Sequence, residues 1–144
     1  YELVENSEGP GRHRGGLGLR RDYLFKDQDV TFTILSDRDK SGPWGILGGY
    51  EGRKAYYLLN PQGEAKAMSS KTTLDLKPGD TISYQTCGGG GYGLPEERAP
   101  KLVLKDVRDG KVSIERAKSI YKTVINLNDW TVNKSETDQL RKKN

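Results

Sequence analysis

The sequence is poor in the residues from which metal sites, disulfides and membrane spans are built. Its 144 residues include one cysteine, Cys87, and one histidine, His13. A single cysteine excludes an internal disulfide framework, and these two residues are too few for a Cys/His zinc site within the chain. No apolar run approaches the roughly 18 residues of a membrane-spanning helix, and no signal-peptide pattern is present. We therefore expect a cytoplasmic protein in which this chain itself binds no metal.

Apolar side chains are also scarce. Hydrophobic residues make up 33% of the chain and charged residues 31%. The length suits one domain, and this composition leaves that domain a lean interior. With 18 glycines and 6 prolines, the chain is richer in turn-forming residues than average but below the low-complexity range. We expect a loop-rich, mostly β domain that borrows core or surface from a partner and is not a fully stable monomer alone.

The charge is mixed. There are 24 lysines and arginines against 20 acidic residues, a net charge of +4, and part of the excess lies in Arg141-Lys142-Lys143 at the end of the chain. This balance permits nucleic-acid binding, but no aromatic-basic motif accompanies it. A nucleic-acid partner is therefore the least favoured of the functions considered.

Alternating hydrophobicity predicts a series of short strands in the first two thirds of the chain. The last two strands flank Lys77-Pro78-Gly79-Asp80, whose central proline and glycine predict the turn of a hairpin. The predicted strands cover residues 17–25, 29–35, 55–59, 72–76 and 81–86.

The periodicity changes after Gly93. Apolar residues over 102–107 followed by Gly110 predict a helix with a glycine cap. Ser113 begins a second amphipathic pattern that continues to Val124, and a short helix is expected from Ser135. The fold class is therefore α+β: mainly short antiparallel strands with glycine-rich loops, followed by C-terminal helices. We expect residues 1–93 as the β-rich part and 94–144 as a helical part packed on it, together forming one structural unit.

Four consecutive glycines, Gly88, Gly89, Gly90 and Gly91, follow the last predicted strand. Each costs backbone entropy on folding, so the run requires a reason. Positive φ angles, or close approach of the backbone to a ligand or another chain, would supply one, and loops at strand ends often carry function. A flexible linker is the alternative; the flanking tyrosines favour a structured loop.

A second glycine-rich segment, residues 9–18, carries Arg12, His13 and Arg14. Guanidinium groups among mobile glycines suit an oxyanion, so the segment is a candidate phosphate or carboxylate cradle; a surface turn with solvated arginines is equally consistent. Neither a Walker A loop nor a Rossmann fingerprint is present. His13 is a candidate general acid or base, although a lone loop histidine is more often solvated. The pattern contains no nucleophile–base pair, so the chain alone should not be a complete catalyst.

Several strings resemble, in order, motifs of the hydantoinase B/oxoprolinase family. The resemblance covers essentially the whole chain but only the last quarter or so of such a subunit, so we expect a split subunit or a piece of a longer chain. Two positions depart from the family pattern: Cys87 stands where proline is usual, and Leu94 where a small polar residue is common. The strings are GGLGLRRDY (15–23), LSDR (35–38), GPWGILGG (42–49), LNP (59–61), SKT (70–72), LKPGD (76–80), GGGGYG (88–93), VLKDVRDGKVS (103–113) and TDQLR (137–141).

This resemblance implies an ATP-dependent complex of an A-type and a B-type subunit. In the family, the A-type subunit phosphorylates the oxygen of a cyclic amide, urea or ketone enolate, which is then hydrolysed or carboxylated with help from the B-type subunit. Members act on hydantoins, 5-oxoproline, lactams, acetone or acetophenone. ATP and Mg are thus implied on the A-type partner, and a divalent metal in the N-terminal part of the B-type subunit, which has no counterpart here. A non-catalytic β-rich interaction or assembly module of a multisubunit complex is the alternative.

The resemblance and the residue patterns together give the candidate site. We expect His13 as a catalytic residue and Cys87 as a reduced, non-catalytic thiol. A valine at Gly89 or Gly90 should abolish turnover without unfolding the chain, whereas the same change at Gly63 should be mild. The candidate substrate- or phosphate-binding residues are Arg12, Arg14, Arg20, Arg21, Gly88, Gly89, Gly90 and Gly91.

Overall fold

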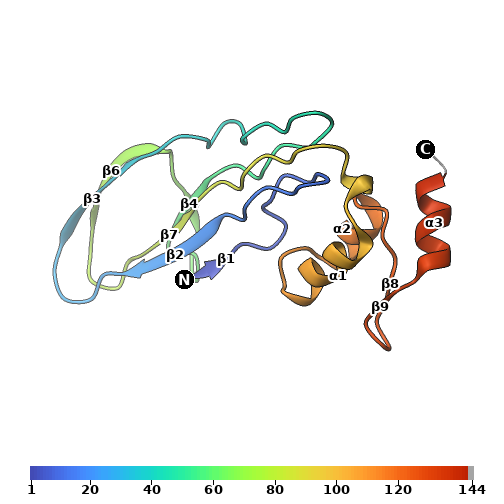
Figure 1. Cartoon of the computed structure of the whole chain (residues 1–144). Helices are drawn as coiled ribbons and strands as arrows, with labels where there is room; N and C mark the ends of the chain where they lie inside the picture. The colour runs from blue at the N-terminus through green and yellow to red at the C-terminus, as the bar shows by residue number, and fades with distance from the viewer. Residues whose placement is uncertain (143–144) are drawn as a thin grey trace.

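The structure, a computed structural model, describes residues 1–142. Lys143 of the basic tail therefore lies outside the described residues. Strands occupy one end of an elongated molecule and helices the other, with long extended segments running between them (Figure 1). No helix in the described part of the chain is long and apolar enough to cross a membrane.

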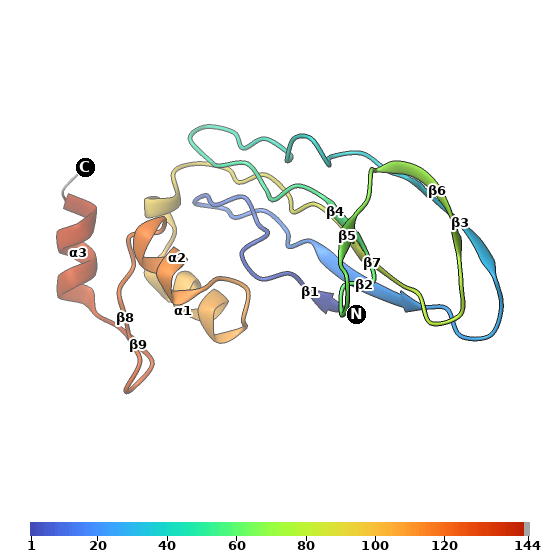
Figure 2. The same cartoon turned by 180° about the vertical axis from the view of Figure 1, so that it is seen from behind.

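The larger sheet has five antiparallel strands in the order β1-β2-β7-β4-β5. The central strand β7 places Tyr84 opposite Arg21 of β2 and Tyr57 of β4. Ile82 of β7 and Tyr57 are fully buried, as expected for apolar side chains in the middle of a sheet. The strand bounds are β1 Glu2–Leu3, β2 Leu19–Leu24, β4 Tyr56–Leu59, β5 Lys66–Ala67 and β7 Thr81–Gln85. Figure 2 shows β5 at the edge beyond β4.

A separate two-stranded sheet pairs β3 (Val30–Leu35) with β6 (Lys71–Leu76). The predicted turn is present, since Gly79 has φ +97° and the Asp80 amide donates to Lys77 O at 3.0 Å. The predicted hairpin is wrong, because β6 before the turn pairs with β3 whereas β7 after it pairs with β2. Phe25, just after β2, pairs with the turn itself: its carbonyl accepts from the Gly79 amide and its amide donates to Asp80 O. The turn is therefore a bend at which a two-stranded ribbon passes from one sheet to the other.

The first helices follow the glycine run. A 3-10 turn, η1 (Pro95–Glu97), precedes helix α1 (Pro100–Arg108). Gly110, at φ +65°, donates to Val107 O and Lys111 donates to Asp106 O, which is the Schellman arrangement that ends a helix. The predicted glycine cap is confirmed.

Helix α2 (Ile114–Ser119) is capped by Ser113, as predicted, but it is shorter than the pattern suggested. The chain leaves the helix as Lys122 takes φ +50°, so the expected continuation to Val124 is wrong. Tyr121 keeps the helical spacing in sequence but lies in the core of this part of the molecule. The apolar pattern therefore predicted correctly that Tyr121 is buried, but it overestimated the length of the helix.

A small hairpin and a last helix complete the described chain. Strands β8 (Ile125–Asn126) and β9 (Thr131–Val132) lead into α3 (Lys134–Lys142). Asn133 caps α3, with its Oδ1 accepting from the Glu136 amide and its Nδ2 donating to Glu136 Oε1. The predicted short C-terminal helix is confirmed. The core shared by α1, α2 and β8 consists of Val103, Val107, Val112, Ala117, Tyr121 and Ile125.

Candidate functional site

Three glycine-rich segments, residues 7–18, 42–53 and 86–93, lie side by side between the sheet and the helices (Figures 1 and 2). We call them the glycine layer. Each segment is hydrogen-bonded through its backbone to the other two. The Gly9 amide donates to Gly89 O at 2.7 Å, the Ile46 amide to Gly91 O at 2.9 Å, and the Arg53 amide to Ser7 O at 2.9 Å. The glycine run is therefore a structured segment, as predicted, and not a flexible linker.

Close packing of backbone on backbone explains the four consecutive glycines. None of them has a positive φ. A Cβ added to Gly88 would lie 1.7 Å from Ser7 O, and one added to Gly90 would lie 1.9 Å from Trp44 O. Valine at Gly90 should therefore be more destabilising than the sequence suggested, because rigid backbone occupies the space. Gly89 is less constrained, since its nearest neighbour would be the Gly16 amide nitrogen at 3.1 Å.

The amides of the run are largely engaged within the chain. Gly88, Gly89 and Gly91 donate to Arg53 O, Gly16 O and Tyr50 O at 3.0, 2.9 and 2.9 Å. A phosphate cradle needs free N–H groups that converge on the ligand. The run therefore lacks three of the four donors that such a role would use, and contact of these glycines with substrate stays a prediction.

Arg12 and His13 lie at the exposed edge of the glycine layer. His13 exchanges backbone hydrogen bonds with Tyr92, at 3.0 and 2.9 Å, and their rings are 6.0 Å apart. The Arg12 guanidinium is 4.0 Å from the Glu97 carboxylate and remains well exposed. Two of the predicted site residues therefore meet the end of the glycine run at one accessible edge.

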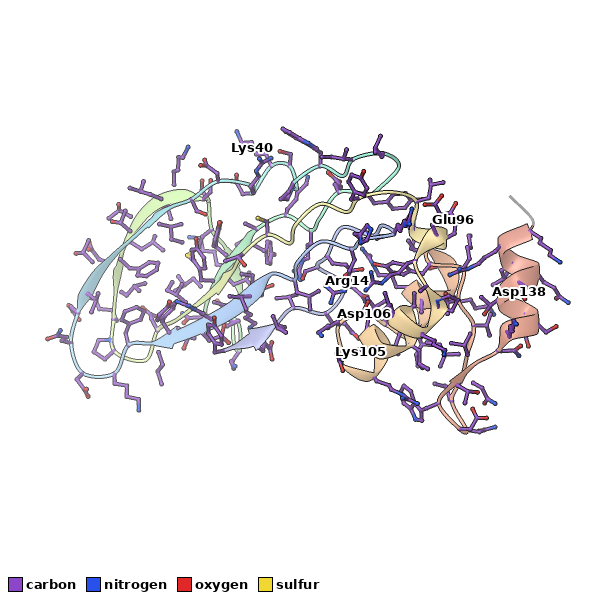
Figure 3. All side chains as sticks on the ribbon, in the orientation of Figure 1. Arg14, Lys40, Glu96, Lys105, Asp106 and Asp138 are labelled. Atoms are coloured by element: carbon purple, nitrogen blue, oxygen red, sulfur yellow. The ribbon has the colours of Figure 1, made fainter. Side chains whose placement is uncertain are left out.

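Arg14 turns inward, toward α1. Figure 3 shows Arg14 beside Asp106. The Nε of Arg14 lies 3.0 Å from Oδ1 of Asp106, and Nη2 of Arg98 donates to Oδ2 of the same carboxylate at 2.8 Å. Only 5% of the Asp106 side chain is exposed. A guanidinium held in this way fastens the glycine layer to the helical part and is not free to bind an anion. Sequence reasoning missed Asp106 and Arg98; the one available signal was a carboxylate next to the apolar Val107 on a helix.

Arg20 and Arg21 lie elsewhere, on β2 of the five-stranded sheet. Arg20 donates to Asp22 and Glu2, whereas Arg21 bonds to the hydroxyl of Tyr1 and lies over its ring at 4.7 Å. The fold does not bring these two arginines to the edge that carries His13.

Glu8 is a second buried carboxylate that sequence reasoning did not single out. Its side chain is fully buried, and its Oε1 accepts from Nε of Arg116 at 3.0 Å and from the Tyr121 hydroxyl at 3.1 Å. Burial raises the pKa of Glu8, an effect that the positive charge of Arg116 opposes without cancelling it. Burial also raises the pKa of Tyr121, with the Glu8 charge adding to the effect. Glu8 and Asp106 are thus two buried anions through which the glycine layer is joined to the helices.

Cys87 is a free, half-buried thiol at the start of the glycine run. It packs against the cluster of Ile34, Ala55 and Tyr57. Within residues 1–142, no three His, Cys, Asp or Glu side chains are grouped so that they could hold a metal ion.

Exposed apolar side chains surround the edge that carries Arg12 and His13. Trp44 and Leu47 are 71% and 69% exposed, and Tyr92 and Leu94 are 49% and 43% exposed. Leu94, one of the departures from the family pattern, lies against Gly48. The edge thus carries an imidazole, a guanidinium and exposed apolar side chains.

Comparison with known sequences gives consistent matches. The sequence model of the hydantoinase B/oxoprolinase family matches residues 1–95. An uncharacterized protein of Methanocaldococcus jannaschii is 43% identical over 143 residues, 98% of this chain and 25% of its own length. The B-type subunit of a putative D-/L-hydantoinase from Pseudomonas sp. strain NS671 is 34% identical over 145 residues, 99% of this chain and 24% of its own. The 5-oxoprolinase 1 of Arabidopsis thaliana is 38% identical over 94 residues, 65% of this chain and 7% of its own.

Two solved structures share the fold along nearly the whole chain. The ATP-dependent caprolactamase from Pseudomonas jessenii superposes with a TM-score of 0.79 at 27% identity, over 99% of this chain and 25% of that one. The nucleotide-free structure of acetone carboxylase superposes with a TM-score of 0.83 at 20% identity, over 99% of this chain and 24% of that one. The chain thus spans about a quarter of the length of the relatives that it matches from end to end.

Proposed function

The chain belongs to the hydantoinase B/oxoprolinase family, and on that basis we propose that it is the C-terminal part, or a split small subunit, of the B-type component of an ATP-dependent amidohydrolase. The enzyme would open a cyclic amide or urea ring in a complex with an ATP-binding A-type subunit. The observation that carries this proposal is the match to a B-type hydantoinase subunit over 99% of the chain. The caprolactamase, a lactam-cleaving relative by name, adds a shared fold over the same extent.

A hydrolase is favoured over a ketone carboxylase. The relatives named for hydrolysis are 34% and 27% identical to the chain. Acetone carboxylase, at 20% identity, supports the fold alone. The substrate class proposed is therefore a cyclic amide or urea, with ketone carboxylation as the outcome that would contradict it.

His13 and Arg12 are the groups proposed to meet the substrate. ATP, bound with Mg on the A-type subunit, would supply the activation that turns the amide oxygen into a leaving group. In this proposal water adds to the activated ring carbon, the imidazole of His13 gives a proton to the ring nitrogen as the C–N bond breaks, and the guanidinium of Arg12 stabilises negative charge on the oxygen of the tetrahedral intermediate. The glycine layer would hold both at fixed positions, because its backbone hydrogen bonds leave the edge little freedom.

An assembly module without catalytic residues is the second candidate. The observation that favours it is the internal use of the other predicted groups: Arg14 is paired with Asp106, and three of the four glycine amides are bonded within the chain. In that case the exposed apolar side chains would contact only protein.

One experiment separates these functions. The chain would be co-expressed with an A-type subunit and the rest of the B-type component, and ATP hydrolysis measured with hydantoins, 5-oxoproline, lactams and ketones. The proposal expects a cyclic amide or urea to stimulate ATP hydrolysis, with ring-opened product formed in proportion. Stimulation only by a ketone with bicarbonate would reject it. Full activity of the complex after substitution of both Arg12 and His13 by alanine would identify the assembly module.

A further inference from the structure

A groove of about 870 Å³ lies between α1, β9 and α3. Leu104, Val132 and Trp130 give it an apolar lining, and Lys101, Arg108 and Lys134 bring cationic side chains to it. Figure 1 shows α3 set apart from α1 and α2, with the β8–β9 hairpin joining them. None of the residues proposed to meet substrate lines this groove, so it is a separate surface.

Helix α3 gains little from its own packing. Thr137 is its one buried residue, and Thr137 Oγ1 accepts from the Val124 amide at 3.0 Å. Arg141 adds hydrogen bonds to Arg98 O and Tyr121 O at 2.9 and 3.1 Å. A nine-residue helix with so little buried apolar surface is stabilised mainly by what packs on it. The side of α3 that faces the groove is therefore left uncovered by the rest of the described chain.

The lining of the groove is positively charged. Lys101 and Lys134 form no ion pair within the described part of the chain. Asp138 is the one carboxylate among the lining residues (Figure 3). Arg108 donates one bond to Trp130 O and keeps other donors. A complementary partner has an apolar face flanked by acidic side chains, which is the character of an amphipathic helix lying in a groove between helices.

The relatives that the chain matches differ in length. The 145 residues matched in the hydantoinase subunit are 24% of it, so that protein is about 600 residues long. The 94 residues matched in the Arabidopsis 5-oxoprolinase are 7% of it, so that protein is about 1,300 residues long. The match to the long protein covers 65% of this chain, close to the extent of the family match over 1–95. The full match, with the helical part, is to the shorter protein that is named a subunit.

We propose that the groove between α1 and α3 docks an acidic amphipathic segment of a separately made A-type subunit. This inference rests on the proposed function for the identity of the partner.

The two tryptophans, Trp44 and Trp130, provide the test. The chain would be labelled with 5-fluorotryptophan, combined with the unlabelled rest of the B-type component, and its two ¹⁹F resonances assigned with Trp44→Phe. Titration with unlabelled A-type subunit should shift the Trp130 resonance, because the docked segment covers the indole. Lys101→Glu with Lys134→Glu should weaken binding at least tenfold at low salt. Lys54→Glu with Lys66→Glu, two exposed lysines at the strand end of the molecule, should change it less than twofold.

A complex that leaves the Trp130 resonance unchanged, or that is weakened equally by both pairs of substitutions, would place docking elsewhere and overturn the inference. A shift of Trp130 by ATP alone would make the groove a small-anion site instead. Docking at Trp130 without ATP hydrolysis stimulated by a cyclic amide would reject the proposed function and keep this inference, and activity without a Trp130 shift would do the reverse.

Discussion

The hydroxyl of Tyr121 donates a hydrogen bond of 3.1 Å to the carboxylate of Glu8, 113 positions earlier in the chain. Arg116 reaches the same carboxylate from α2. Both groups come from the helical part, whereas Glu8 lies in the first segment of the glycine layer. The interaction therefore holds two parts of the fold together through a carboxylate that is fully buried.

Replacing Glu8 by glutamine should change the pH dependence of stability in a defined direction. Because burial raises the pKa of Glu8, the folded protein binds that proton more tightly than the unfolded chain. The free energy of unfolding of the wild type should then rise, relative to Glu8→Gln, as the pH falls from 7 toward the unfolded value near 4.5. Denaturant unfolding at several pH values measures the difference between the two proteins. A difference independent of pH would contradict this expectation.

Removing the charge of Asp106 should be strongly destabilising. Arg14 and Arg98 both depend on this carboxylate for neutralisation, and Asp106→Asn would leave two largely buried guanidiniums with none. Breaking such a pair costs about 3–5 kcal/mol of unfolding free energy. Asp109→Asn, at the C-cap of the same helix, removes a far more exposed carboxylate paired with Lys105 and Lys111; it is the matched control and should have a much smaller effect. Equal losses for the two variants, in denaturant unfolding, would show that the pairing of Asp106 is unimportant.

A single methyl group in the glycine layer should distinguish close backbone packing from simple flexibility. Gly90→Ala would force its Cβ against Trp44 O and should cost about 3 kcal/mol or more, at or above the usual range for overpacking. Gly16→Ala is the control within the layer, and Gly63→Ala the control in an ordinary turn, because a Cβ at either site meets no atom within 4 Å. Both controls should stay within about 0.5 kcal/mol of the wild type. Similar thermal unfolding of all three variants would rule out the packing explanation.

Substitution of His13 tests its proposed role in the assembled enzyme. His13→Gln keeps a polar side chain at an exposed position, so the fold should be unaffected. Loss of a general acid or base lowers kcat by about 10²–10⁴-fold, and we expect a loss in that range with circular dichroism unchanged. A raised KM at constant kcat would instead assign His13 to substrate binding. Unchanged kinetics would remove it from the site altogether.

Local sequence patterns were sufficient for most elements but not for their partners. The alternation of Val30, Phe32 and Ile34 identified β3, and Gly110 and Ser113 identified the boundary between α1 and α2. The sequence also predicted the turn at Gly79, but it did not predict that the strands before and after this turn pair with different strands. The turn itself is hydrogen-bonded to Phe25, more than 50 positions away, and no local pattern reports these bonds.

The candidate site was predicted in part for the same reason. The sequence drew attention to the glycine runs and to Arg12 and His13, which do meet at one edge. It could not show that Arg14 turns inward, because its partner Asp106 is 92 positions later and sits in a helix whose apolar pattern hides it. The burial of Glu8 was not predicted either, because nothing near it in the sequence marks an acidic residue as buried.

The glycine layer also sets an order of events during synthesis. Its first segment is held by backbone hydrogen bonds to both of the others, so residues 7–18 cannot complete these bonds until residues 86–93 have been made. At about 5–20 residues per second, the 75 positions between Gly18 and Gly93 take roughly 4–15 s to translate. Contacts between segments so far apart also form slowly, because the loop must close before any of them is gained. During those seconds the hydrogen bonds between the arginine- and glycine-rich segment 7–18 and residues 86–93 are missing, so the final order of this segment depends on sequence that has not yet been synthesised.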